Sequence, residues 1–342
     1  MVAGHGSGDT VTSGPAEAGH YILGHYILRY ILRRLAFAVF LVFAVSSVSL
    51  VLAWSAPGDY PTESLGIGAR PETIEQTRER LGLNRPLGEQ YRDWLARAAR
   101  LDFGRSLLYD RPVGDLIPER AVNTAVLALT ALLAATLVGL PLGVFTGSRR
   151  GGVPAGAIRG ASLVLLSMPP LLTSLLLVFV AARTGWLPIG GMRSPGAPAG
   201  GITIDLLQHL IVPSLALALP LAAMFERLAA QAMAEVVGQP FVLAALARGV
   251  PRRRVVWRDA LKAGLRPVAA VYGLVVGTLL GGSFAVEIIT AWPGLGSLML
   301  AALQARDVYL VVGCAGAGSI FLAFGTLLSD AALALVDPRV SE

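Results

Sequence analysis

The side chains that usually carry catalysis or bind metal ions are scarce in this 342-residue chain. Its single cysteine, Cys314, lies within an apolar run, so neither an intrachain disulfide nor a cysteine metal site is expected. Three of the four histidines lie within the first 28 residues, which leaves only His209 near a long apolar run. Neither the G-x-S-x-G motif of serine hydrolases nor the G-x-x-x-x-G-K-[ST] phosphate-binding loop occurs. These observations predict a protein without a catalytic site, metal or cofactor of its own.

The segment 240–267 is suited to binding another protein. Its first part, 241–248, has an alanine-rich helical pattern, and Gly249 follows where a C-terminal cap is expected. Pro251 then stands at the first turn of a second helix, 252–265. A basic amphipathic segment that rests on anionic lipid is the alternative interpretation. The residues suited to contact with a partner are a pocket-filling aromatic and three small side chains: Phe241, Ala244, Ala245 and Ala247.

Two carboxylates lie in or near apolar runs, where charge is costly and is often functional. Glu287 precedes a Trp-Pro-Gly sequence, and it either caps the following turn or faces a translocation path. Glu226 is followed directly by Arg227, which suggests an adjacent ion pair or a pair of side chains that extend toward the membrane surface.

Composition places the chain in a membrane. Hydrophobic residues make up 54% and charged residues 15%, whereas about a quarter of a soluble domain is charged. Several apolar runs reach the roughly 20 residues that a helix needs to cross a bilayer. Prolines within these runs, such as the pair Pro169-Pro170, produce either simple kinks or hinges. The six predicted spans are 35–54, 124–146, 161–182, 206–230, 268–290 and 309–336.

Basic residues indicate the orientation of these spans. Arginines precede the first span, follow the second, and are most frequent in the segment 240–267. Because positive residues collect on the cytoplasmic side, both termini and this segment are predicted to be cytoplasmic. The same clustering beside span ends argues against a nucleic-acid-binding surface, despite the net charge of +6.

Two segments lie outside this pattern of spans. Residues 1–28 contain a tandem Gly-His-Tyr-Ile-Leu repeat after a Gly/Ser/Ala-rich stretch and are predicted to be a disordered tail. Residues 29–54 then hold the first span. The segment 55–122 is predicted to be extracytoplasmic and to contain helices at 71–83 and 90–100, the second lying on the membrane surface or on the spans.

Several short motifs together resemble a known family. The run Ala-Ala-Leu-Ala-Arg-Gly that ends at Gly249, with Pro267 eighteen residues later, resembles the EAA loop of ABC-importer permeases. The fuller run with Trp257 and the motifs along the chain resemble the dipeptide/oligopeptide/nickel permeases. Leu243 stands where the general loop has glutamate, and Asp259 where histidine is typical. The further matching motifs are Pro57-Gly58-Asp59, Arg80-Leu81-Gly82-Leu83, Asp102-Phe103-Gly104, Asn123-Thr124, Trp292-Pro293-Gly294-Leu295-Gly296, Arg306-Asp307 and Asp337-Pro338-Arg339.

The resemblance implies an all-α membrane protein with six spans and the ABC type I importer permease (MetI-like) fold, its five-helix core lying at 123–342. It implies a permease subunit in a prokaryotic inner membrane that pairs with a second, homologous permease, as a heterodimer, which is the usual pairing in this family. Two ATPase subunits would supply the energy, and an extracytoplasmic binding protein would deliver peptides. The residues that it assigns to ATPase coupling are Phe241, Ala244, Ala245, Ala247, Arg248, Gly249, Trp257 and Pro267.

Three alternatives stay open at this point. The same architecture could import nickel or another small solute. An ion-coupled secondary transporter would require internal inverted repeats and embedded ion ligands, and no convincing repeat is visible. A membrane hydrolase would require a Ser-His pair that the motifs do not supply.

Overall fold

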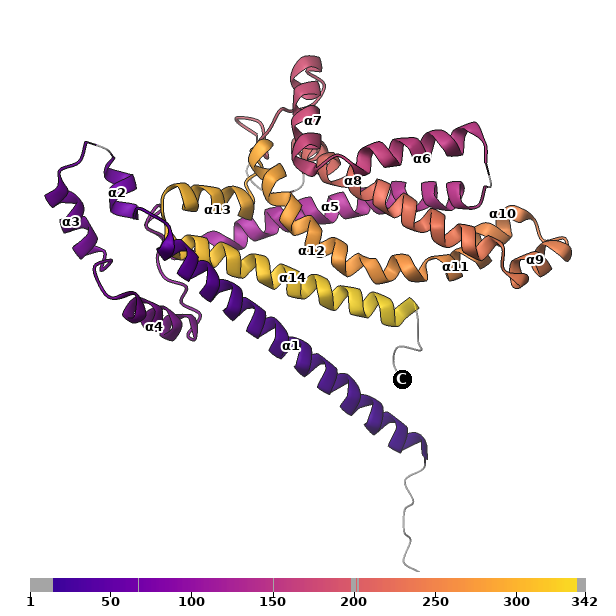
Figure 1. Ribbon diagram of the computed structural model, residues 1–342, viewed down its shortest axis with the longest axis horizontal. Coiled ribbons are helices and arrows are strands. Elements are labelled where there is room, and N and C mark those ends of the chain that lie inside the picture. The colour runs from indigo at the N-terminus through magenta and orange to yellow at the C-terminus, as the bar shows by residue number, and fades with distance from the viewer. Residues whose placement is uncertain (1–14, 67, 150, 198–200, 202, 337–342) are drawn as a thin grey trace, which may run out of the picture.

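The computed structural model describes residues 15–66, 68–149, 151–197, 201 and 203–336. The regular secondary structure of this part is helical apart from one isolated β-bridge, between Arg105 and Pro112. The long helices run along one axis of the molecule, with small helices gathered at both ends (Figure 1). The expected all-α fold is confirmed. The long helices are α1 (Pro15–Ser55), α5 (Val113–Gly147), α8 (Ile204–Val237), α12 (Arg266–Ile289) and α14 (Val308–Val336).

The centre of the molecule is the contact between α5 and α8, which is the most extensive between any two elements. Three glycines, Gly139, Gly143 and Gly147, recur every four residues along α5 and face the backbone of α8. An added Cβ at any of them would collide with a backbone carbonyl of α8. Small residues at this spacing let two helices approach closely, which is how membrane helices gain packing energy without a hydrophobic driving force.

Among the described residues, four helices are long and apolar enough to cross a bilayer, and two bent helix pairs raise the possible number to six. The predicted third span differs from expectation, because it consists of α6 (Val153–Leu166) and α7 (Pro170–Thr184), which meet at 106°. The break falls at Pro169-Pro170. Proline excludes the helical conformation from the residue before it and removes a backbone donor, so two in succession end α6 and begin α7 in a new direction.

Helix α1 packs along α14 and presents apolar side chains such as Phe40 and Leu52 outward, each more than 60% exposed. The helix begins at Pro15, inside the segment 1–28 that is predicted to be a disordered tail, and residues 1–14 lie outside the described part. Proline is favoured in the first helical turn, where Pro15 stands. No proline follows before Pro57, so none interrupts the helix. Once the apolar span has formed, extending it in either direction adds a hydrogen bond per residue without a new nucleation cost.

Three short helices form a unit at one end of the molecule: α2 (Tyr60–Leu65), α3 (Pro71–Arg80) and α4 (Leu87–Ala98). The two helices expected here are confirmed in α3 and α4. The buried Trp94 of α4 packs against Leu50 of α1 and Val312 of α14, so the helix lies on the spans.

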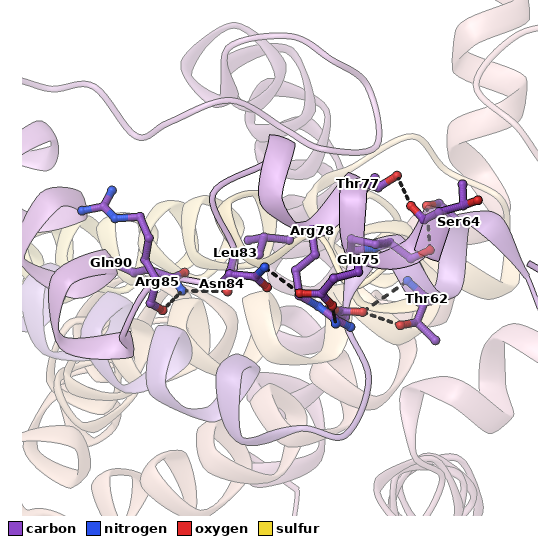
Figure 2. A network of polar contacts seen from close by, with 12 residues as sticks. Thr62, Ser64, Glu75, Thr77, Arg78, Leu83, Asn84, Arg85 and Gln90 are labelled. Carbon is purple, nitrogen blue, oxygen red and sulfur yellow. Dashed lines mark hydrogen bonds and ion pairs between the residues drawn. The ribbon is translucent and has the colours of Figure 1, made fainter. Parts of the chain in front are cut away.

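A polar network crosses the α2–α4 unit and sets the positions of its helices (Figure 2). Arg78 donates to Asp59 at 2.6 Å and to Glu75 at 2.6 Å, which ties α3 to the start of α2. Asn84 donates to the other oxygen of Glu75, and Arg85 donates to Asp93 of α4 at 2.6 Å. The connecting turns are therefore bonded to all three helices.

Candidate functional site

The segment 240–267 lies at the end of the molecule opposite the α2–α4 unit (Figure 1). It is called the coupling loop below. Its first helix, α9 (Pro240–Ala247), begins with a proline and ends before Gly249, whose φ of +81° lies in the left-handed region. The Val250 N–H then donates to the Ala245 carbonyl at 3.2 Å. Because L-residues with a Cβ avoid this conformation, Gly249 allows the chain to leave the helix sharply, as predicted.

The inner face of the coupling loop is a small apolar core. Val242 and Ala245 of α9 are buried against Val255, Val256 and Ala260 of the next turn. Met233 of α8 and Val144 of α5 complete this cluster. The expected role of Ala245 as a contact for a partner is therefore corrected: its side chain is only 7% exposed and holds the loop onto the long helices.

The outer face of the coupling loop is apolar and open. Ala244, Ala247 and Arg248 are exposed, as expected for contact residues. Phe241 is 48% exposed and Leu243 is 55% exposed, although phenylalanine and leucine side chains are among those most often buried in folded proteins. The two side chains lie on different sides of α9, because residues two apart on a helix point about 200° apart, and Leu243 is on the side of the cleft toward the end of α5.

After Pro251 the chain forms α10 (Arg252–Arg254), the π-helical turn η1 (Val255–Ala260) and α11 (Leu261–Gly264). The second helix expected at 252–265 is thus present, but its middle part, η1, is π-helical. A π-turn inserts one extra residue per turn, so it rotates the side chains that follow, and such turns are frequent at functional sites. Trp257 lies on η1 and is 45% exposed. Pro267 is exposed in the first turn of α12.

Two arginines that motif reasoning did not single out connect α5 to its surroundings. Arg252, the first residue of α10, donates to the Ser148 carbonyl at 2.7 Å. Arg159 of α6 donates to the Thr146 carbonyl at 2.6 Å. The last carbonyls of a helix lack partners within it and carry partial negative charge, so arginines satisfy them well. The sequence shows only that Arg252 follows Pro251 at the start of a helix. The fold then brings Arg252 to the end of α5, where it meets the Ser148 carbonyl.

Glu226 has a different partner from the one expected. Its carboxylate is 1% exposed and accepts a hydrogen bond from the Thr146 hydroxyl, which joins α8 to α5. The expected ion pair with the neighbouring Arg227 is corrected, since no salt bridge joins these residues in the described part of the chain. Adjacent residues on a helix point about 100° apart, so Arg227 faces away from the buried Glu226.

Glu287, in the last turn of α12, is fully buried. One carboxylate oxygen accepts from the Thr124 hydroxyl at 2.7 Å, and the other accepts from the Gly296 N–H at 2.7 Å. Of the two interpretations left open, this geometry favours the one in which Glu287 caps the following turn. Glu287 also belongs to the lining of a cavity of about 320 Å³ that includes Tyr109 and Arg120, so the second interpretation, a role in the translocation path, stays a prediction.

The residues beside Glu287 and Thr124 form further hydrogen bonds across the same contact. Trp292, which is fully buried, donates from Nε1 to the Asn123 carbonyl at 3.0 Å. The Asn123 side chain donates in return to the Pro293 carbonyl at 2.8 Å. Two of the sequence motifs, Asn123-Thr124 and the run that begins at Trp292, therefore form one structural unit.

No cluster of three or more potential metal-binding side chains occurs in the described residues. The described residues instead include a loop that packs on the long helices and exposes apolar side chains at one end, and a helical unit with a bonded polar network at the other.

Comparison with known proteins places this architecture in context. The chain matches the family described as binding-protein-dependent transport system inner membrane component over residues 139–342, and the N-terminal model of that family over residues 27–127. It is 31% identical over 313 residues to the oligopeptide transport system permease protein AppB of Bacillus subtilis, covering 91% of this chain and 98% of that protein. It is 32% identical over 320 residues to a putative peptide permease protein of Brucella ovis, covering 92% and 99%. It is 30% identical over 315 residues to the glutathione transport system permease protein GsiC of Escherichia coli K12, covering 92% and 99%.

Proposed function

The chain belongs to the family of binding-protein-dependent transport system inner membrane components, and on that basis we propose that it carries peptides across the membrane for an ATP-driven importer. An extracytoplasmic binding protein delivers the peptide, and separate subunits hydrolyse ATP. The chain itself is a multi-pass permease of the ABC type with the peptide permeases as its relatives. Nickel or another small solute is the alternative cargo for the same architecture, but the oligopeptide and peptide permeases among its relatives favour peptides.

The observation that carries the proposal is the geometry of the coupling loop. Its inner face is buried against α5 and α8, while Phe241, Ala244 and Ala247 on its outer face are exposed. A protein bound to the outer face could therefore move the loop and the long helices together as one body. This is the mechanical connection that an ATPase subunit needs to drive a change between inward-facing and outward-facing states.

The direction of assembly follows from the same arrangement. We place the coupling loop and both termini in the cytoplasm, where the arginine-rich segments of the chain belong. Two ATPase subunits bind there, one on this chain and one on a second, homologous permease. The α2–α4 unit then lies on the outer side and meets the binding protein.

Site-directed cross-linking tests this assignment. In a Cys314→Ala background, cysteines replace Ala244 and Ala247, which are exposed on α9, and Ala245, which is buried on the same helix. The exposed positions should cross-link to an ATPase subunit in the assembled transporter, and the buried position should not. A cysteine at the exposed Glu72 of α3 should reach the binding protein instead. Cross-links from α9 to the binding protein would refute the proposed orientation.

A further inference from the structure

A cleft with a volume of about 860 Å³ lies between the end of α5 and the coupling loop. One wall is the turn after α5, which includes Arg149, and the other is formed by α9 and the start of α10 and η1. Arg159 of α6 and Arg252 of α10 complete the cleft, so three guanidinium groups from three elements line it. Neither the coupling role nor the transport cycle described above uses this space.

The three arginines have no carboxylate partner in the described part of the chain. Arg252 donates to the Ser148 carbonyl, and Arg159 donates to the carbonyls of Thr146 and Arg149. The Arg149 guanidinium lies over the Phe145 ring, 4.2 Å from its centre. These partners are neutral, and each guanidinium has five N–H donors, so both positive charge and donors remain for a ligand.

One carboxylate that could neutralise this charge is Glu226, which shares a second cavity with Arg159. Its carboxylate instead accepts a hydrogen bond from Thr146 and forms no salt bridge with a described arginine. The cleft between α5 and the coupling loop therefore favours an anion.

The position of the cleft selects the kind of anion. The apolar stretch of α5 ends at about Thr146, so Arg149 stands three residues beyond it, where lipid head groups meet the protein. The rest of the lining includes the apolar side chains of Val242, Leu243 and Leu246. A ligand with an anionic head and an apolar body would contact both kinds of surface, whereas free phosphate would contact only the arginines.

We propose that this cleft binds the head group of an anionic phospholipid, with Arg149, Arg159 and Arg252 around the phosphate and the apolar lining against the start of the acyl chains. Arginine suits this role because its planar fork donates two parallel hydrogen bonds to phosphate oxygens. A lipid held between α5 and α10 would stabilise the contact through which the coupling loop meets the long helices.

Native mass spectrometry of the detergent-purified, assembled transporter tests the proposal during titration with phosphatidylglycerol. Arg149→Gln and Arg252→Gln should each weaken retention of the lipid roughly fivefold, the effect of one arginine near a membrane surface. Arg253→Gln and Arg254→Gln make the same charge change in exposed neighbours that do not line the cleft, and they should change retention less than twofold. Equal losses of lipid retention in all four variants would show that general surface charge, and not the cleft, holds the lipid, and would overturn the proposal.

A second variant keeps every arginine contact in place. Leu243→Glu puts a carboxylate into the lining and should weaken phosphatidylglycerol retention, whereas Leu243→Gln should not. Phosphatidylcholine and inorganic phosphate, each titrated as a separate arm, should bind weakly and fail to displace phosphatidylglycerol. Displacement by inorganic phosphate at similar concentrations would show a site for free anions, and an unchanged affinity in Leu243→Glu would show that lipid binds elsewhere.

Discussion

The Thr124 hydroxyl donates a hydrogen bond of 2.7 Å to the Glu287 carboxylate across 163 residues of sequence. The same hydroxyl accepts from the Leu295 N–H at 2.9 Å, so one threonine joins α5, the end of α12 and the start of α13 (Leu295–Gln304). Both residues are fully buried. The contact therefore fixes the turn between α12 and α13 against the central helix.

Replacing Thr124 with valine should destabilise the folded protein. Valine keeps the shape of threonine, but it leaves the buried Glu287 oxygen and the Leu295 N–H without this partner, which costs about 1–3 kcal/mol. Thermal unfolding of the purified protein in detergent measures the loss as a lower Tm. Thr184→Val is the control, because Thr184 is exposed and bonds only within its own helix and the turn after it. Equal shifts in the two variants would contradict the role of Thr124.

Replacing Gly249 with alanine should uncouple ATP hydrolysis from transport. An L-residue in the left-handed region costs roughly 1–2 kcal/mol, and the chain can avoid that cost by changing its path after α9. Peptide uptake by reconstituted transporter should then fall while ATP hydrolysis by the assembled complex persists. Gly238→Ala is the matched control, because Gly238 has φ −84° and an added Cβ would meet only an ordinary contact at 3.7 Å. Unchanged uptake in Gly249→Ala would count against the coupling role of this turn.

The ion pair between Asp59 and Arg78 should make the α2–α4 unit sensitive to acid. Burial by itself raises the pKa of Asp59, but hydrogen bonds from Arg78 and Thr62 outweigh it, so the pKa of this carboxyl is lowered in the folded protein. The pair therefore stabilises the fold fully above the unfolded pKa of about 3.9, and this contribution is lost as the pH falls through the folded pKa.

The Asp59→Asn variant isolates this effect, because its amide does not titrate. The difference in thermal stability between the natural protein and Asp59→Asn should be largest near neutral pH and should shrink as the pH falls below about 4. Limited proteolysis of the α2–α4 unit provides a local measurement beside the global Tm. A difference that stays constant down to pH 3 would show that the pair contributes no pH-dependent stability.

Deleting residues 2–24 should leave peptide uptake intact. The part of α1 that is apolar enough to cross a bilayer, Leu32–Ser55, has 24 residues and is long enough without the preceding turns. The shortened and full-length chains should therefore support equal uptake at equal amounts in the membrane, as quantified by immunoblotting. Lower uptake per inserted molecule would assign a function to the N-terminal segment.

Several features of the protein could be predicted from its sequence because they depend on neighbouring residues. The apolar runs predict helices that cross a membrane, since length and hydropathy alone set that requirement. Gly249 and Pro251 predict the end of one helix and the beginning of the next, because their backbone preferences act locally. The helices α3 and α4 were predicted from their spacing of apolar residues for the same reason.

Other features were decided only by the tertiary structure. Ala244 and Ala245 are identical in type and adjacent in sequence, yet one is exposed and the other is buried against Val255 and Met233. The partners of Glu226 and Glu287 lie 80 and 163 residues away, so no local pattern could identify them. Local preferences determine where helices begin and end, whereas the packing of distant helices determines which side chains meet between them and which remain open to a partner.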